Sequence, residues 1–384
     1  MKKSFLPFAL PDIDSNEIDE VVDTLKTGWL TSGPKVKTFE SNFQKFIKGG
    51  VQAIAVNSAT SGLHLALEAL NVGAGDEVIV PTLTFTATAE VVRYLNADIK
   101  LVDIDPITLN INPNEIRKAI TKKTKVIMVV HYAGLSCDME SILELAKEFN
   151  LKVIEDAAHA LSTKYKGNLI GTLYSDITVF SFYANKTITT GEGGMVVTKS
   201  DRLADRMRIM RLHGIDRDVY DRFLSKSPSW YYEVIEAGFK YNMTDISAAI
   251  GIHQLNKLPS FLKRRQYLAN RYFELLSELP LVLPQDDTNA GTHSWHLYVI
   301  RIKNNAKLNR DELIRFLNDA GIGTSVHYIP LHRQPYWKNR YQLSNKMFPV
   351  ADHIYKSMLS IPLYTAMTDQ DQDLVIEALH KALT

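Results

Sequence analysis

The sequence predicts an α/β protein built on a mainly parallel sheet flanked by helices, with a smaller α+β region at its C-terminal end. Three observations lead to this class. Short apolar runs alternate with helical patterns between about residues 50 and 200. The runs are apolar throughout rather than at every second residue, which indicates strands buried on both faces. Helices lie between most of the strands, as the crossovers of a parallel sheet require.

The elements of the larger region follow in chain order. Residues 12–26 have helical spacing, with Ile18, Val21, Val22 and Leu25 on one face. Strands are expected at 53–56, 77–80, 99–104, 125–130, 151–157, 176–182 and 193–198. Helices are expected at 58–70, 88–95, 112–120, 139–149 and 201–213.

The pattern changes after about residue 200. Residues 214–243 lack clear periodicity, and such a long irregular stretch indicates a functional segment or an interface. Helices are expected near 244–257 and 260–279, then strands at 294–302 and 323–328 and helices at 309–320 and 368–383. We therefore expect a large α/β domain with an N-terminal arm at 1–255. A linking helix and a small α+β domain are expected at 256–384.

Composition excludes several classes of function. The 384 residues include 44 Lys and Arg against 43 Asp and Glu, so the net charge is +1. That balance gives no field to attract nucleic acid or an anionic membrane, and no apolar run approaches the roughly 20 residues of a membrane span. Cys137 is the single cysteine, which excludes an internal disulfide and suits a reducing compartment. We expect a cytoplasmic protein without a metal site.

The segment "NSATSGLHLAL" predicts an anion site at the start of a helix. Free backbone N–H groups and the helix dipole point toward whatever lies there. Thr60, Ser61 and Gly62 would allow a phosphate to approach the backbone. An ordinary helix cap explains the same residues.

Two further side chains that could bind or react with a ligand lie at the ends of strands in the same sheet. Asp156 ends the apolar run of "VIEDAAHA". In open α/β sheets, ligands bind beyond the carboxyl ends of the strands, which is where Asp156 is expected. The alternative is that Asp156 is a solvated strand end or a helix cap. Lys186 follows the strand "DITVF" and is otherwise part of a solvated hairpin loop. Burial would lower its pKa and leave an amine able to react with a carbonyl. A phosphate site, a carboxylate for a ring nitrogen and a reactive lysine together indicate pyridoxal 5′-phosphate.

Several long motifs resemble the sugar aminotransferase (DegT/DnrJ/StrS) family, in family order over nearly the whole chain. They are "GWLTSGP", "NSATSGLHLAL", "GDEVIVPTLTFTATA", "VIEDAAHA", "FSFYANKTITTGEGGMV", "GFKYNMTDISAAIG" and "GIGTSVHYIPLH". The resemblance implies a fold-type I pyridoxal-phosphate enzyme that is usually a homodimer with shared active sites. The motifs "VVHYAG", "EDAAHA", "LHGIDRDVYDR" and "FKYNMTDI" are most similar to the UDP-4-amino-4-deoxy-L-arabinose aminotransferase branch.

The resemblance also implies roles for individual residues. Lys186 matches the lysine that carries the cofactor, and Asp156 matches the acid that pairs with the pyridine nitrogen. Further cofactor contacts are implied for Phe85, which would stack on the ring, for Thr60, Ser61 and Ser181 at the phosphate, and for Asn242 from the partner chain. Substrate contacts are implied for Thr31 and His327. His159 departs from the glutamine of many members, although imidazole can also form a hydrogen bond to the cofactor hydroxyl.

The expected reaction is transamination between glutamate and a nucleotide-linked keto-sugar, with amination at C4 and with pyridoxamine phosphate formed in turnover. The product would serve surface polysaccharide or lipid-linked amino-sugar synthesis. Two alternatives remain: a dehydratase or other lyase on the same cofactor, and a regulator that binds the cofactor without turnover. Some relatives with histidine at the catalytic position are dehydratases, and Lys186 argues against that branch.

Overall fold

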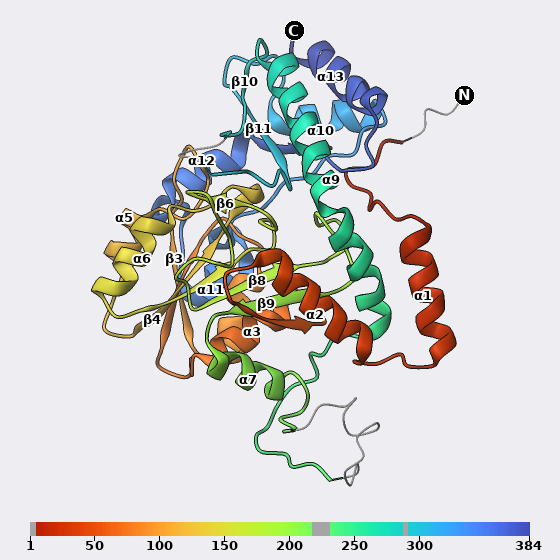
Figure 1. Cartoon of the computed structure of the whole chain (residues 1–384). Helices are drawn as coiled ribbons and strands as arrows, with labels where there is room; N and C mark the ends of the chain where they lie inside the picture. The colour runs from red at the N-terminus through yellow and green to blue at the C-terminus, as the bar shows by residue number, and fades with distance from the viewer. Residues whose placement is uncertain (1–4, 217–230, 287–290) are drawn as a thin grey trace.

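A seven-stranded sheet lies at the centre of the larger domain in the computed structural model, which describes residues 5–216, 231–286 and 291–384 (Figure 1). Its order is β1-β9-β8-β5-β4-β2-β3. The strands are β1 (Gln52–Val56), β2 (Glu77–Pro81), β3 (Asp98–Val102), β4 (Thr124–Val130), β5 (Lys152–Asp156), β8 (Ile177–Ser181) and β9 (Gly194–Thr198). Neighbouring strands from β8 to β3 are parallel, whereas β9 is antiparallel to both β8 and β1. The predicted mainly parallel sheet is confirmed.

Helices cover both faces of this sheet, which explains its unbroken apolar runs. One face packs on α3 (Ala59–Ala69), α4 (Ala87–Tyr94) and α7 (Asp201–Met210). The other packs on α2 (Pro34–Ile47), α5 (Pro113–Ala119), α6 (Met139–Glu148) and part of α9 (Asp245–Leu276). Gly62 sets how closely α3 approaches, because a Cβ there would lie 2.8 Å from Val179 Cγ1. A larger residue would therefore push the start of α3 away from the sheet.

The small domain packs around a three-stranded antiparallel sheet, in the order β10-β11-β12. Its strands are β10 (Leu281–Val282), β11 (Tyr298–Ile302) and β12 (Met358–Ile361), and its helices include α10 (Arg310–Asp319), α11 (Pro335–Tyr341), α12 (Pro349–Ser357) and α13 (Asp369–Leu383). The strand predicted at 323–328 is wrong: Ser325 forms only an isolated bridge with Ser360. The third strand is instead β12, a four-residue run too short for its pattern to be recognised.

One helix joins the two domains where two were predicted. α9 continues through Pro259, which has no N–H to donate to the previous turn. The helix packs Leu258 into the larger core and Tyr272 into the core of the small domain. Burial along its length outweighs the roughly 3 kcal/mol cost of the proline. We propose that the domains meet within this helix, at the boundary expected between residues 255 and 256.

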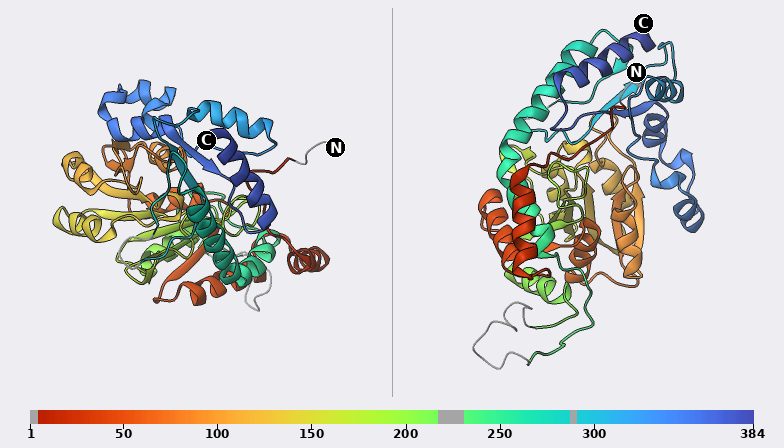
Figure 2. Two further views of the ribbon diagram at one scale, coloured as in Figure 1. Left: turned by 90° about the horizontal axis from the view of Figure 1, so that it is seen from above. Right: turned by 90° about the vertical axis from the view of Figure 1, so that its right-hand side faces the viewer.

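The predicted first helix is confirmed as α1 (Ser15–Thr27), but its apolar face points away from the protein. α1 lies along the outside of α9 (Figure 2). Its buried residues include Glu17, which accepts hydrogen bonds from Asp14 and from Gln254 of α9. Ile18 is 56% exposed and Leu25 52% exposed.

Two expectations from the sequence can be compared only with the residues that the structure describes: the long irregular segment and the absence of a membrane span. Of the irregular stretch at 214–243, residues 217–230 lie outside the described part of the chain. None of the helices in the described ranges combines the length and apolar character that crossing a membrane would take.

Candidate active site

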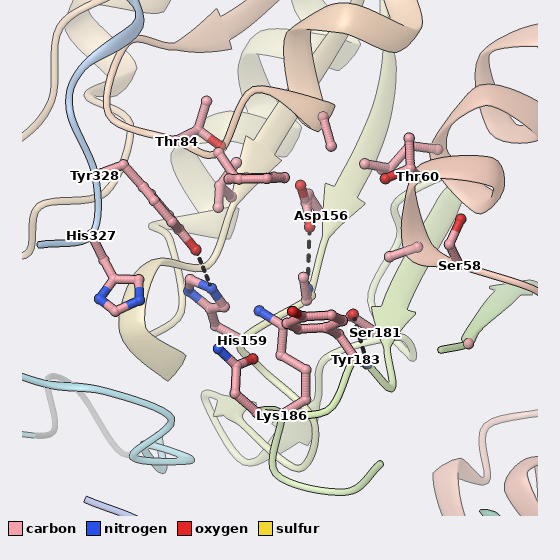
Figure 3. Close-up of a pocket in the computed structure, with 18 of the residues that line it drawn as sticks. Ser58, Thr60, Thr84, Asp156, His159, Ser181, Tyr183, Lys186, His327 and Tyr328 are labelled. Carbon is pink, nitrogen blue, oxygen red and sulfur yellow. Dashed lines mark hydrogen bonds between the residues drawn. The ribbon is translucent and has the colours of Figure 1, made fainter. Parts of the chain in front are cut away.

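A cavity of about 510 Å³ opens where β5 and β8 end and α3 begins (Figure 3). Its walls come from both domains. The larger domain supplies the strand ends and the loop after β8, and the small domain supplies His327 and Tyr328. Among the residues expected at the site, Thr60, Phe85, Asp156, His159, Ser181, Lys186 and His327 line this cavity. The structure thus brings these seven residues together at one cavity, and their roles toward a cofactor or a substrate remain predictions.

The start of α3 forms one end of the cavity. Ser58 caps the helix, because its hydroxyl accepts the N–H of Ser61 at 3.1 Å. Ser58 and Thr60 line the cavity, whereas the Ser61 hydroxyl is buried and lies 2.8 Å from Asn57 Oδ1. Ser61 therefore shapes the helix start, and its expected contact with the phosphate remains a prediction. Backbone N–H groups and hydroxyls at a helix N-terminus suit a phosphate.

Asp156 is held at the end of β5 by two hydrogen bonds. The hydroxyl of Thr88 donates to Oδ2 at 2.8 Å, and the N–H of Ala158 donates to Oδ1 at 3.2 Å. Thr88 in turn lies 2.8 Å from the hydroxyl of Thr84. Burial raises the pKa of Asp156, and these hydrogen bonds and the charge of Lys186 oppose that rise. A protonated ring nitrogen would complete the environment of this carboxylate.

Lys186 enters the same cavity from the turn after β8, where its own N–H donates to the carbonyl of Tyr183 at 2.9 Å. Burial lowers the pKa of Lys186 to about 8, although the nearby carboxylate of Asp156 favours the charged form. No hydrogen-bond acceptor or counter-ion contacts its Nζ within the described residues. With this pKa, roughly a tenth of the amine is neutral at pH 7, far more than for a lysine with the ordinary pKa.

The wall opposite α3 is aromatic and imidazole-rich. His159 Nε2 lies 2.9 Å from the hydroxyl of Tyr328, and the Tyr328 ring centroid is 5.6 Å from that of Phe85. His327 is buried, with Nδ1 2.9 Å from the hydroxyl of Ser360, and burial lowers its pKa to about 4. Burial also lowers the pKa of His159 well below its usual value. Both imidazoles are therefore neutral at physiological pH.

Asn242 and Thr31 lie away from this cavity. The amide Nδ2 of Asn242 donates to the hydroxyl of Ser32 at 2.7 Å, and Lys240 Nζ donates to its Oδ1 at 2.6 Å. The carbonyl of Thr31 accepts the N–H of Asp245 at the head of α9. The expected contact of Asn242 with the phosphate of a second chain and the expected contact of Thr31 with the substrate remain predictions.

The polar residues that sequence reasoning missed at the site include Ser58, Thr88, Tyr183, Asn185 and Tyr328. All but Thr88 line the cavity directly. Tyr328 follows His327 in "SVHYIP", and Tyr183 and Asn185 precede Lys186 in "FYANK", so adjacency to expected site residues was the available signal. Thr88 follows Phe85 by three residues in "GDEVIVPTLTFTATA", but its contact with Asp156 spans 68 residues and no local pattern indicated it.

These residues fit pyridoxal 5′-phosphate. The start of α3 suits its phosphate, Asp156 suits its ring nitrogen, and Lys186 suits its aldehyde. Gly194 allows β9 to pass close to the start of α3, because a Cβ there would lie 2.9 Å from the N of Ala59. The described residues contain no group of three or more metal-ligating side chains placed to hold an ion.

Comparisons with known proteins agree with this geometry. Residues 11–380 match the model of the DegT/DnrJ/EryC1/StrS aminotransferase family. The spore coat polysaccharide biosynthesis protein SpsC of Bacillus subtilis is 46% identical, with 98% of this chain and 97% of SpsC covered. The uncharacterized protein MJ1066 of Methanocaldococcus jannaschii is 48% identical, with 100% and 99% covered.

A solved structure has the same fold. The putative sugar aminotransferase Spr1654 of Streptococcus pneumoniae, in its PMP-form, superposes with a TM-score of 0.91 and 35% identity over 98% of each chain. A PLP-form of the same protein superposes with a TM-score of 0.90. The sequence, the cavity and the relatives thus agree on the fold, the cofactor and the general activity.

Proposed function

The chain belongs to the DegT/DnrJ/EryC1/StrS aminotransferase family and uses pyridoxal 5′-phosphate, and we propose that it transfers the amino group of glutamate to C4 of a nucleotide-linked keto-sugar. The observation that carries the proposal is the meeting of Lys186, Asp156 and the start of α3 at one cavity. The names of SpsC and Spr1654 support a sugar substrate and a role in polysaccharide synthesis.

The chain's own residues account for the proton movements. When bound, the cofactor supplies an electron sink for the carbanion formed at the substrate carbon. Lys186 Nζ, with its pKa lowered to about 8, takes a proton from the substrate carbon and returns it on the cofactor side. Asp156, held by Thr88, keeps a proton on the ring nitrogen. Thr60, Ser61 and Ser181, together with Ser58, would hold the phosphate.

The proposed sugar site lies on the side of the cavity formed by the small domain. His327 reaches this wall, and its neutral imidazole can form a hydrogen bond with a sugar hydroxyl. A nucleotide held outside the cavity would supply binding energy that orients the keto carbon. Thr31 is the second residue that we propose for the substrate.

We also propose a cytoplasmic homodimer with shared active sites. The N-terminal segment exposes apolar side chains that a second copy of the chain would bury. They are Phe5, Leu10, Ile13, Ile18, Val22, Leu25 and Leu30. Asn242 would reach the cofactor phosphate of the partner. Its position at the head of α9, where backbone N–H groups begin a helix, suits an anion.

A two-step colour assay tests the function. The purified protein loaded with cofactor is expected to lose its yellow colour with glutamate, and to regain it when a nucleotide-linked 4-keto-sugar is added. Mass spectrometry should then find the amino-sugar. A lyase would change the keto-sugar without needing glutamate, and a regulator would turn over neither substrate. Either result would overturn the proposal.

A further inference from the structure

We propose that Tyr328 donates a hydrogen bond to the ring hydroxyl oxygen of the cofactor, and that His159 orients the phenol rather than contacting that oxygen itself. The inference rests on the proposed site residues and extends them to a side chain that they do not include. It also reassigns the role expected for His159.

The tautomer of His159 is the first step. The backbone N–H of Ala133 donates to His159 Nδ1 at 3.2 Å, so Nδ1 carries no hydrogen. The imidazole is buried beneath the cavity wall and neutral, which places its one N–H on Nε2. Nε2 is 2.9 Å from the hydroxyl oxygen of Tyr328, so the imidazole donates and the phenol accepts.

The phenol hydrogen of Tyr328 is therefore left for another acceptor. The Tyr328 ring lies between the ring of His159, at 6.0 Å, and that of Phe85, at 5.6 Å. These contacts hold the ring at the cavity wall with its hydroxyl group at the cavity. No described residue accepts a hydrogen bond from this hydroxyl group, so a ligand oxygen is the partner it lacks.

The three anchors of the cofactor decide which oxygen that is. The ring nitrogen belongs at Asp156, the aldehyde carbon at Lys186, and the phosphate arm at Ser58 and Thr60. The ring hydroxyl is attached next to the aldehyde-bearing carbon, on the side away from the phosphate arm. Figure 3 shows Tyr328 and His159 on the side of Lys186 opposite to Ser58 and Thr60. The hydroxyl oxygen therefore faces this pair.

The test is the pKa of the Lys186 nitrogen in the holoenzyme, read from the colour of the resting protein during a pH titration without sugar. The negative ring oxygen stabilises the protonated nitrogen beside it, and a donor on that oxygen weakens this effect. Tyr328→Phe removes only the hydroxyl and should raise this pKa by about one unit, the size of one hydrogen bond to a charged group. The other titratable groups near this nitrogen are unchanged: Asp156, His159, Tyr183, Glu192, His296 and His327.

Matched variants complete the design. Tyr174→Phe makes the same change at a side chain that is 90% exposed, and should leave the titration as in the wild type. His159→Leu keeps the phenol but removes the group that orients it, and should raise the pKa by less than Tyr328→Phe does. An unchanged or lowered pKa in Tyr328→Phe overturns the proposal. A shift in His159→Leu alone would mean that the imidazole contacts the oxygen directly.

A second measurement applies if Tyr328→Phe binds cofactor too weakly to titrate. The wild type should bind the 3-deoxy analogue, which lacks the ring hydroxyl, at least about tenfold more weakly than pyridoxal phosphate. In Tyr328→Phe this ratio should fall toward one, and an unchanged ratio overturns the proposal. Neither measurement uses a sugar or glutamate, so failure of the proposed substrate would leave both results interpretable.

Discussion

Lys186 and Asp156 carry opposite charges in one cavity, and burial acts on them in opposite directions. It lowers the pKa of Lys186 to about 8 and raises that of Asp156, because removal from water disfavours the charged form of each. Their mutual attraction reduces both shifts. The lysine is the group whose protonation changes near physiological pH, since the imidazoles of His159 and His327 are already neutral there.

The first prediction at this scale concerns cofactor capture. Only the neutral amine of Lys186 reacts with the cofactor aldehyde, so the rate constant for capture by the cofactor-free protein should rise about tenfold per pH unit below pH 8 and level off above it. Stopped-flow absorbance on cofactor-free protein measures this rate. A rise that continues to the ordinary lysine pKa would show that burial does not lower the pKa in solution.

The second prediction concerns the substitution Asp156→Ala. The ring nitrogen loses its partner, and a hydrogen bond to a charged group contributes about 1.5–3 kcal/mol, so kcat should fall by at least about 10- to 100-fold. The cofactor should still bind. Asp311→Ala is the control, because Asp311 lies exposed in the first turn of α10, and it should retain full activity. A fall in kcat below about threefold for Asp156→Ala would make Asp156 a structural strand-end residue.

At the scale of elements, α1 shows that an amphipathic pattern does not say which partner the apolar face meets. The helix attaches to α9 through its polar side, where Lys257 pairs with Glu17 at 2.7 Å and His253 lies 2.9 Å from Glu20. Its apolar stripe faces outward, with Ile18 and Leu25 each more than half exposed. A pattern that would normally cover a core thus remains available to another chain.

The prediction for this element is that Leu25→Asp weakens the dimer. Burying a leucine contributes about 1.5–3 kcal/mol, so the dissociation constant should rise at least about tenfold in sedimentation equilibrium. Asn16→Asp adds the same charge to an exposed position of α1 and should leave the dimer unchanged. Circular dichroism should show that both variants keep α1. Equal dissociation constants for the two variants would place the interface elsewhere.

At the scale of the whole molecule, the cavity takes walls from both domains but does not include Asn242. The side chain of Asn242 is held by Lys240 and Ser32 beside the end of β1. We propose that Asn242 also reaches the cofactor phosphate of the partner chain. Each complete site would then combine Lys186 of one chain with Asn242 of the other.

Mixed dimers test this arrangement. Lys186→Ala dimers should have two dead sites, and Asn242→Ala dimers two weak ones. A mixed dimer regains one site with both groups intact, so co-expressed, differently tagged variants should recover up to about half the wild-type activity per dimer. The measurement is kcat of the purified mixed dimer. If it only equals the average of its parents while Asn242→Ala is impaired, Asn242 serves its own chain.

The sequence by itself determined the parts of this protein that depend on neighbours in the chain. Apolar runs marked the buried strands, and the carboxyl ends of parallel strands lie at one edge of a sheet, so Asp156 and Lys186 could be expected together. Their motifs also resembled one family over nearly the whole length. Local pattern was sufficient here because each of these signals is contained within a few residues.

The tertiary structure alone decided the contacts between distant segments. Thr88 holds Asp156 across 68 residues, and His159 meets Tyr328 across 169. The continuity of α9 and the outward apolar face of α1 likewise depend on burial against other elements. Such contacts gain their free energy from burial and hydrogen bonds formed only in the folded chain, and no local period in the sequence encodes their partners.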